Sequence, residues 1–187
     1  PWGKIPDSLR ENAMEYYRQA EAFAAELLSW VEAHSPAEVA ELYREPLSNM
    51  IKDSGQTLLR VLHYPPMTGS EEPGAVRAAA HEDINLLTVL PAANEPGLQV
   101  MDVNGEWMDV PCDPGQLVIN VGDMLQETSG GYFPSTTHRV INPTGEGSSQ
   151  SRLSLPLFLH PRPEVVLSDK HTADSYLKER LRELGVI

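Results

Sequence analysis

Two histidines and an aspartate have the residue types and spacing of a metal site. His81 and Asp83 are separated by one residue at the mouth of an apolar run, and His138 lies on a later run of the same kind. Side chains alternate between the two faces of a strand, so His81 and Asp83 are expected to point to the same side. Two imidazoles and one carboxylate form the facial triad that binds non-haem Fe(II) and leaves positions open for substrate and O2. The pattern therefore indicates an iron site made by His81, Asp83 and His138, and the alternative at this point is a chance or structural His-x-Asp pair.

A second pair with the same spacing suits an anion. Arg152 and Ser154 are two residues apart on a predicted strand, so both side chains are expected on one face. A guanidinium group beside a hydroxyl fits a carboxylate, which arginine binds through two parallel hydrogen bonds. The alternative is an outward-facing Arg152 on a solvated face. The order of all five residues along predicted strands favours the anion site.

The secondary structure predicted to position these residues is helical in the first third of the chain and mostly strand after it. Helical spacing of apolar residues predicts a helix over 8–34 that begins at a capping box formed by Ser8 and Glu11. Ser35, followed by a proline, predicts the start of a second helix that ends near Tyr43. A last helix is expected over about 172–184.

From residue 57 onward the chain consists of short apolar runs separated by turn residues. The runs rich in Val, Ile, Leu and Thr cover 58–64, 84–90, 97–103, 106–110, 116–121, 136–141 and 153–159. Asn104-Gly105 between two of these runs is a strong hairpin signal. Many short strands at this spacing predict a sandwich or a barrel rather than alternating strands and helices.

The local sequences around these residues are similar to a known family, the iron- and 2-oxoglutarate-dependent dioxygenases of the isopenicillin N synthase-like group. The matching stretches are Leu58 to Pro66, His81 to Asp83, Gly97 to Val100, Gly105 to Trp107, Val121 to Asp123, His138-Arg139 and Arg152 to Ser154. The resemblance implies a mainly β fold with flanking helices (α+β), whose core is a distorted double-stranded β-helix, or jelly roll. We expect a helical segment over 1–54, the jelly-roll core over 55–165 and a C-terminal helix over 166–187.

The resemblance also implies roles for individual residues. Iron would be bound by His81, Asp83 and His138, and the distal carboxylate of 2-oxoglutarate by Arg152, Ser154 and the hydroxyl of Tyr64. The implied cofactors are Fe(II), 2-oxoglutarate as cosubstrate and O2, with ascorbate as an optional reductant. The implied reaction oxidises a small molecule, usually by hydroxylation, while 2-oxoglutarate is converted to succinate and CO2.

The chain departs from the family pattern in two places. Several relatives carry Asn two residues before the tyrosine, and this chain has Leu62, so one polar contact to the cosubstrate is expected to be missing. Family members usually carry a longer amino-terminal region that helps to close the active site. Unless further residues precede Pro1, an incomplete substrate pocket is expected.

Composition bears on partners and location. Lys and Arg number 14 and Asp and Glu 27, which gives a formal net charge of −13. Such a field repels phosphate backbones and anionic lipid, so we expect a small-molecule substrate and neither nucleic acid nor membrane as a partner. The single cysteine, Cys112, cannot form an internal disulfide, which makes the reducing cytoplasm the expected location. Nothing in the sequence selects an oligomeric state.

Two other functions fit the same residues. An iron oxidase on this fold that does not use 2-oxoglutarate would bind a substrate carboxylate with Arg152 and Ser154, and it would form no succinate. A catalytically inactive jelly-roll protein would bind metal or ligand without consuming oxygen. The leading prediction is the 2-oxoglutarate-dependent dioxygenase.

Overall fold

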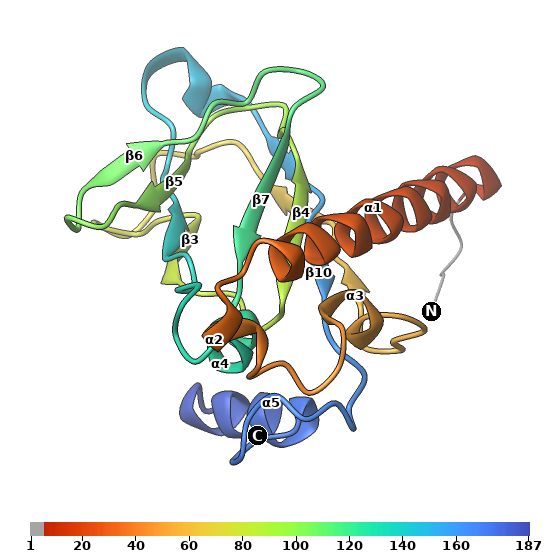
Figure 1. Ribbon diagram of the computed structural model, residues 1–187. Helices are drawn as coiled ribbons and strands as arrows, with labels where there is room; N and C mark the ends of the chain where they lie inside the picture. Colours follow the sequence, from red (N-terminus) through yellow and green to blue (C-terminus); the bar gives the residue numbers. More distant parts are fainter. Residues whose placement is uncertain (1–5) are drawn as a thin grey trace.

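The structure, a computed structural model, describes residues 6–187. In this part of the chain, short antiparallel strands form two four-stranded sheets and one two-stranded sheet, with helices packed around them (Figure 1). The strands are β1 (Leu58–Leu59), β2 (Leu62–Tyr64), β3 (Ala78–His81), β4 (Leu87–Pro91), β5 (Leu98–Met101), β6 (Trp107–Asp109), β7 (Leu117–Val121), β8 (His138–Val140), β9 (Arg152–Ser154) and β10 (Leu157–Leu159). The helices are α1 (Asp7–Ala33), α2 (Ala37–Ala40), α3 (Leu47–Met50), α4 (Asp123–Thr128) and α5 (Ala173–Glu183), with a 3-10 turn, η1 (Gly145–Ser149).

The sheet order brings strands together that are far apart in the sequence. One sheet has the order β1-β10-β4-β7 and the other β3-β8-β5-β6, while β2 pairs with β9 beyond the ends of β1 and β10. In these ladders Thr88 lies opposite Asn120, and Tyr64 lies opposite Arg152. The predicted mainly β fold with flanking helices is thereby confirmed.

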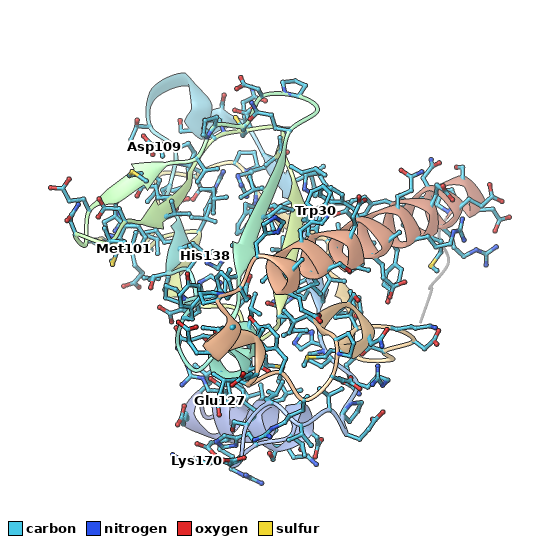
Figure 2. The ribbon with its side chains drawn as sticks, viewed as in Figure 1. Trp30, Met101, Asp109, Glu127, His138 and Lys170 are labelled. Carbon is cyan, nitrogen blue, oxygen red and sulfur yellow. The ribbon has the colours of Figure 1, made fainter. Side chains whose placement is uncertain are left out.

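The Asn104-Gly105 hairpin also forms as predicted. It joins β5 to β6, and Met101 pairs with Trp107 across it. Figure 2 labels Met101 and Asp109, which belong to these two strands. Gly105 has a φ of 82°, a conformation that a side chain would disfavour.

Helix α1 packs across β4 and β10 (Figure 1). Its buried face consists of Ala20, Ala24 and Leu28, four residues apart, so they fall on one side of the helix. The Tyr16 hydroxyl donates to the backbone carbonyl oxygens of Val89 at 3.0 Å and Leu155 at 3.3 Å, and burial raises the pKa of Tyr16 to about 12. The helix is therefore fixed both to β4 and to the link between β9 and β10.

Two helix starts differ from the prediction. Helix α1 begins at Asp7 with Pro6 in the N-cap position and no side-chain cap, because the fixed φ of proline starts the helix before Ser8. The predicted Ser8 capping box is therefore wrong. Ser35 does not cap α2 either, since its hydroxyl donates to the carbonyl oxygen of Val31 and pairs with the Tyr43 hydroxyl. Helix α2 is consequently only one turn long.

One hydrophobic core joins residues from all three predicted segments. It includes Leu28 of α1, Leu87 of β4, Leu157 of β10 and Ala173 of α5. The division at residues 54 and 165 stays a prediction, and residues 1–5 of its first segment lie outside the described part. None of the described helices combines the length and apolarity required to cross a bilayer.

Candidate active site

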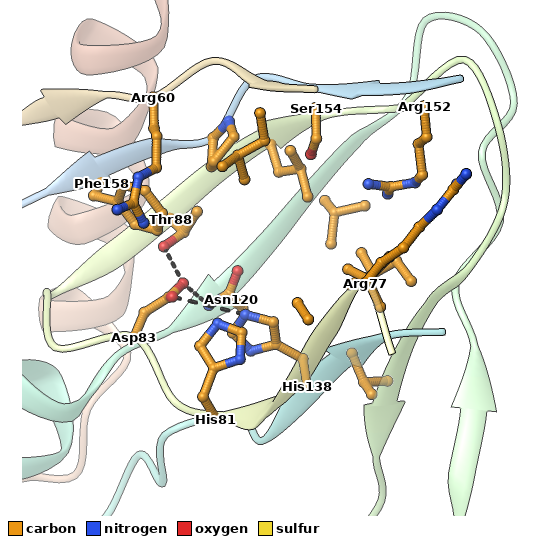
Figure 3. Close-up of a pocket in the computed structure, with 18 of the residues that line it drawn as sticks. Arg60, Arg77, His81, Asp83, Thr88, Asn120, His138, Arg152, Ser154 and Phe158 are labelled. Carbon is orange, nitrogen blue, oxygen red and sulfur yellow. Dashed lines mark hydrogen bonds and ion pairs between the residues drawn. The ribbon is translucent and has the colours of Figure 1, made fainter. Parts of the chain in front are cut away.

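A cavity of about 360 Å³ lies between the two four-stranded sheets, and all six predicted site residues line it. Figure 3 labels five of them: His81, Asp83, His138, Arg152 and Ser154. Its walls are mostly apolar and come from strands of all three sheets, including the β2·β9 pair. The apolar lining residues are Leu62, Ala78, Leu90, Leu98, Val100, Val118, Val140, Pro156 and Phe158. A concave apolar chamber with a few convergent polar groups is typical of a small-molecule site.

The structure brings His81, Asp83 and His138 together at one side of this cavity. Their ligand atoms all lie within 4.8 Å of one another, and the two imidazole centroids are 4.4 Å apart. Nε2 of His138 is 3.7 Å from Oδ1 of Asp83. His81 ends β3 and lies opposite His138, the first residue of β8, so the sheet itself places the two rings side by side.

The hydrogen bonds of both histidines leave Nε2 as the nitrogen available to a metal ion. The Nδ1 atom of His81 is 2.7 Å from the carbonyl oxygen of Ala79, and that of His138 is 2.9 Å from the carbonyl oxygen of Thr136. A carbonyl oxygen only accepts, so Nδ1 must carry the proton in each ring. The lone pair of each Nε2 is left free, as in histidines that bind metal ions.

Asp83 is held by two side chains that the sequence analysis did not identify. Its Oδ2 accepts hydrogen bonds from the Thr88 hydroxyl at 2.6 Å and from the Asn120 amide at 2.9 Å (Figure 3). Thr88 on β4 and Asn120 on β7 lie directly opposite each other in the sheet. The Asn85 side-chain amide in turn donates to the Thr88 hydroxyl at 2.8 Å. Because Oδ2 is occupied, Oδ1 of this buried carboxylate is the oxygen left for a metal ion.

The expected reason for the convergence of His81 and Asp83 is wrong. Strand β3 ends at His81, so Asp83 lies in the turn before β4 and the two do not alternate along one strand. The turn is instead held by α4, because the backbone N–H of Asp123 donates to the Asp83 carbonyl at 2.7 Å and that of Met124 to the Asn85 carbonyl at 3.0 Å.

Gly122 makes this close approach possible. A Cβ atom at position 122 would lie 2.2 Å from Oδ1 of Asn85 and 2.8 Å from the carbonyl oxygen of Asp83. Any side chain there would push away the turn that carries the metal-facing carboxylate. The donor set that results, two neutral imidazole nitrogens and one carboxylate oxygen, fits Fe(II).

The other polar end of the cavity is built around Arg152. Its side chain is buried, Nε donates to the Glu95 carbonyl at 3.0 Å, and Nη1 is buried without a hydrogen-bond partner in the described chain. Burial lowers the pKa of the Arg152 guanidinium, because the charged form loses its hydration. Ser154 is also buried, and the Tyr64 ring centroid is 5.6 Å from Cζ of Arg152. Burying a guanidinium group with an unpaired N–H donor is costly unless an anion binds to it, so this end of the cavity is suited to an anion.

Two further arginines line the cavity and were missed by the sequence analysis. Nη2 of Arg77 donates to the carbonyl oxygens of Pro65 at 3.1 Å and Gln150 at 3.3 Å, while its Nε and Nη1 are buried without partners among the described residues. Arg60 lies at the opposite end, near Phe158 (Figure 3). The position of Arg60 could have been predicted from the sequence, since Arg60, Leu62 and Tyr64 are two residues apart and side chains two apart on an extended chain share a face.

Comparisons with known proteins identify the class. Residues 55–161 match the family model described as the 2OG-Fe(II) oxygenase superfamily. A Shewanella oneidensis protein provisionally described as an oxygenase is 66% identical, with a TM-score of 0.90 over 100% of this chain and 69% of that one. The 2-oxoglutarate-Fe(II) type oxidoreductase hxnY of Emericella nidulans is 32% identical over 87% of this chain and 45% of its own. A full-length Neurospora crassa protein, solved in complex with alpha-KG and thymine, is 25% identical, with a TM-score of 0.77 over 98% of this chain and 60% of that one.

The chain belongs to the 2OG-Fe(II) oxygenase superfamily. The predicted family and jelly-roll fold are confirmed, and Fe(II), 2-oxoglutarate and O2 are the cofactors of that family. The chain spans about half the length of the curated relatives that it matches.

Proposed function

We propose that this chain forms the catalytic jelly roll of an Fe(II)- and 2-oxoglutarate-dependent dioxygenase that oxidises a small molecule, usually by hydroxylation. One observation carries the proposal: a single cavity contains a preorganised His-Asp-His triad and, away from it, a buried arginine with an unsatisfied donor. A dicarboxylate such as 2-oxoglutarate can use both, with one carboxylate at the metal and the other at the guanidinium.

The triad residues would hold Fe(II) through Nε2 of His81, Nε2 of His138 and Oδ1 of Asp83. When bound, iron with 2-oxoglutarate and O2 supplies the oxidising chemistry that yields succinate, CO2 and an oxidised substrate. The protein contributes fixed ligand directions, because the backbone carbonyls orient both rings and the Thr88–Asn120 pair orients the carboxylate.

The anion-binding residues would hold the distal carboxylate of 2-oxoglutarate. Nη1 of Arg152 and the hydroxyl of Ser154 would donate to it, and the Tyr64 hydroxyl would complete the set. Leu62 lies opposite Ser154 on the neighbouring strand, so the wall there is apolar where several relatives carry an amide. Apolar walls exclude water and strengthen a buried guanidinium–carboxylate pair. Ascorbate as an optional reductant and the cytoplasmic location belong to the same proposal.

The test is an anaerobic titration of the chain with Fe(II) and then with 2-oxoglutarate, followed by the visible charge-transfer band of the chelate. We expect a saturable band in the wild type and none in His81→Ala. Exposure to O2 should then produce succinate in proportion to the 2-oxoglutarate consumed. Iron binding without the band would favour the oxidase or the inactive binding protein, and failure to bind iron would refute the metal site.

A further inference from the structure

Arg60 faces the cavity from the side that the proposed cosubstrate leaves free. Side chains alternate along this segment, so Arg60, Leu62 and Tyr64 share one face, and the Arg60 N–H donates to the Pro156 carbonyl at 3.0 Å. Four residues of extended chain separate Arg60 from Tyr64, roughly 13 Å. Figure 3 shows the Arg60 side chain near Phe158 and Thr88 and above Asp83, with Arg152 and Arg77 at the far end of the cavity.

The guanidinium of Arg60 has no partner within the described chain. No hydrogen bond, ion pair or ring contact of its side chain occurs among residues 6–187, and its exposed position leaves it open to a ligand. The only carboxylate among the described lining residues is Asp83, which is committed to the metal site and to its two hydrogen bonds.

A count of formal charges shows that the loaded cavity still lacks anions. The described lining residues supply three guanidinium groups and one carboxylate, and the histidines are neutral as metal ligands. Fe(II) adds two positive charges and 2-oxoglutarate two negative ones, so two positive charges remain. This local excess exists in a chain whose formal net charge is −13. The loaded cavity is therefore positively charged although the protein as a whole is negatively charged, and a positively charged cavity favours an anionic substrate.

Arg77 and Arg60 are placed to serve different groups. Arg77 is tied to Pro65 and Gln150 and lies 5.9 Å from the Tyr64 ring centroid, so it belongs to the cosubstrate end. Arg60 is alone at its end, where Phe158 offers an aromatic surface. One guanidinium beside an aromatic ring suits a monoanion with an apolar body rather than a polyphosphate.

We propose that Arg60 binds the carboxylate of the primary substrate, and that this substrate is a small monocarboxylic acid whose apolar or aromatic body lies against Phe158 and over the metal triad. This inference rests on the proposed function and names its substrate class. Arg60 selects the substrate by charge, while the triad and the Arg152 end carry the reaction common to the family.

The experiment uses the 187-residue chain loaded anaerobically with Fe(II) and 2-oxoglutarate. Matched acids and amides are then added: phenylacetate with phenylacetamide, benzoate with benzamide, and hexanoate with hexanamide. The readouts are the shift of the charge-transfer band and, after O2 is admitted, the initial rate of succinate formation. We expect at least one acid to shift the band and to raise the succinate rate, with an affinity at least tenfold above that of its amide.

The variant Arg60→Gln should weaken binding of the responding acid about ten- to hundredfold, which is the range for losing a charge-assisted hydrogen bond. The 2-oxoglutarate concentration that half-saturates the charge-transfer band should stay unchanged. Arg139→Gln is the matched control, because Arg139 stacks on Trp107 at 4.0 Å and does not line the cavity. The inference is overturned if amides act as well as acids, if no acid responds, or if Arg60→Gln keeps the response. A band that never forms before acid is added refutes the proposed function instead, so the two failures are distinguishable.

Discussion

Replacing Thr88 by valine tests how the protein orients its metal-binding carboxylate. The change keeps the shape of the side chain and removes the hydroxyl that donates to Oδ2 of Asp83 at 2.6 Å. A hydrogen bond to a charged group contributes about 1.5–3 kcal/mol, and the Asn85 amide also loses its acceptor. We therefore expect the metal-free chain to lose about 2 kcal/mol of unfolding free energy.

Metal affinity should fall less than it would if Asp83 itself were removed. Asn120 still donates to Oδ2 at 2.9 Å, so the carboxylate keeps one of its two anchors. Loss of a supporting contact outside the metal ligands typically costs about 10- to 100-fold in affinity, and the remaining anchor places Thr88→Val near the lower value, about 1.4 kcal/mol.

The assay is a titration with Mn(II), an air-stable probe for the site, in which free Mn(II) is counted by electron paramagnetic resonance. Thr88→Ser is the matched control, because it keeps the hydroxyl and loses only a methyl group, and it should bind within about threefold of the wild type. If Thr88→Val binds Mn(II) as tightly as the wild type, the hydrogen bond does not position Asp83 and the reasoning fails.

Three further predictions concern the cosubstrate, the turn and the pH dependence. Arg152→Gln should raise the 2-oxoglutarate concentration that half-saturates the charge-transfer band about ten- to hundredfold, while Mn(II) affinity stays unchanged. An unchanged half-saturation concentration would mean that the anion site is misplaced. Gly122→Ala should lower the free energy of unfolding, measured in urea, by about 2–3 kcal/mol and weaken Mn(II) binding. Gly55→Ala is the control and should do neither, because there is open space around a Cβ at position 55. Equal stabilities of the two variants would contradict the prediction. Burial lowers the pKa of His160 below its ordinary value of 6.5, so the unfolded chain binds a proton that the native chain excludes. Stability should therefore be full above that ordinary pKa and fall as the pH drops below it, by up to about 1.4 kcal/mol per pH unit. His160→Gln should reduce this slope in urea unfolding between pH 7.5 and 5, and an unchanged slope would assign the loss to other groups.

The metal ligands were predictable because their signal is local. A histidine and an aspartate one residue apart, with a second histidine on a later strand, already define the donor set. The geometry behind it was not predictable. The segment before His81 is Ala78-Ala79-Ala80, which has none of the β-branched residues typical of strands, so β3 was not expected.

The supporting residues depend on pairing that no local pattern reveals. Thr88 and Asn120 meet only because β4 and β7 pair in one particular register, and a shift of β7 by one residue would turn Asn120 away from Asp83. Arg60 is a different case, because extending the two-residue alternation back from Tyr64 would have placed it in the cavity. The local sequence, by contrast, was sufficient for the hairpin at Gly105 and for the last helix, which was expected over about 172–184 and spans Ala173–Glu183.

The anchoring of α1 by Tyr16 has a consequence for how the chain is made. Its hydroxyl bonds to carbonyls 73 and 139 residues further along, at Val89 and Leu155. During synthesis α1 leaves the ribosome before the strands, and its second anchor emerges only after nearly the whole jelly roll has been translated. Until then the stripe of Ala20, Ala24 and Leu28 lacks β10, one of the two strands on which α1 packs, so part of this apolar surface stays uncovered. Closing contacts over such long sequence separations is slow, so docking of α1 should be among the last steps of folding.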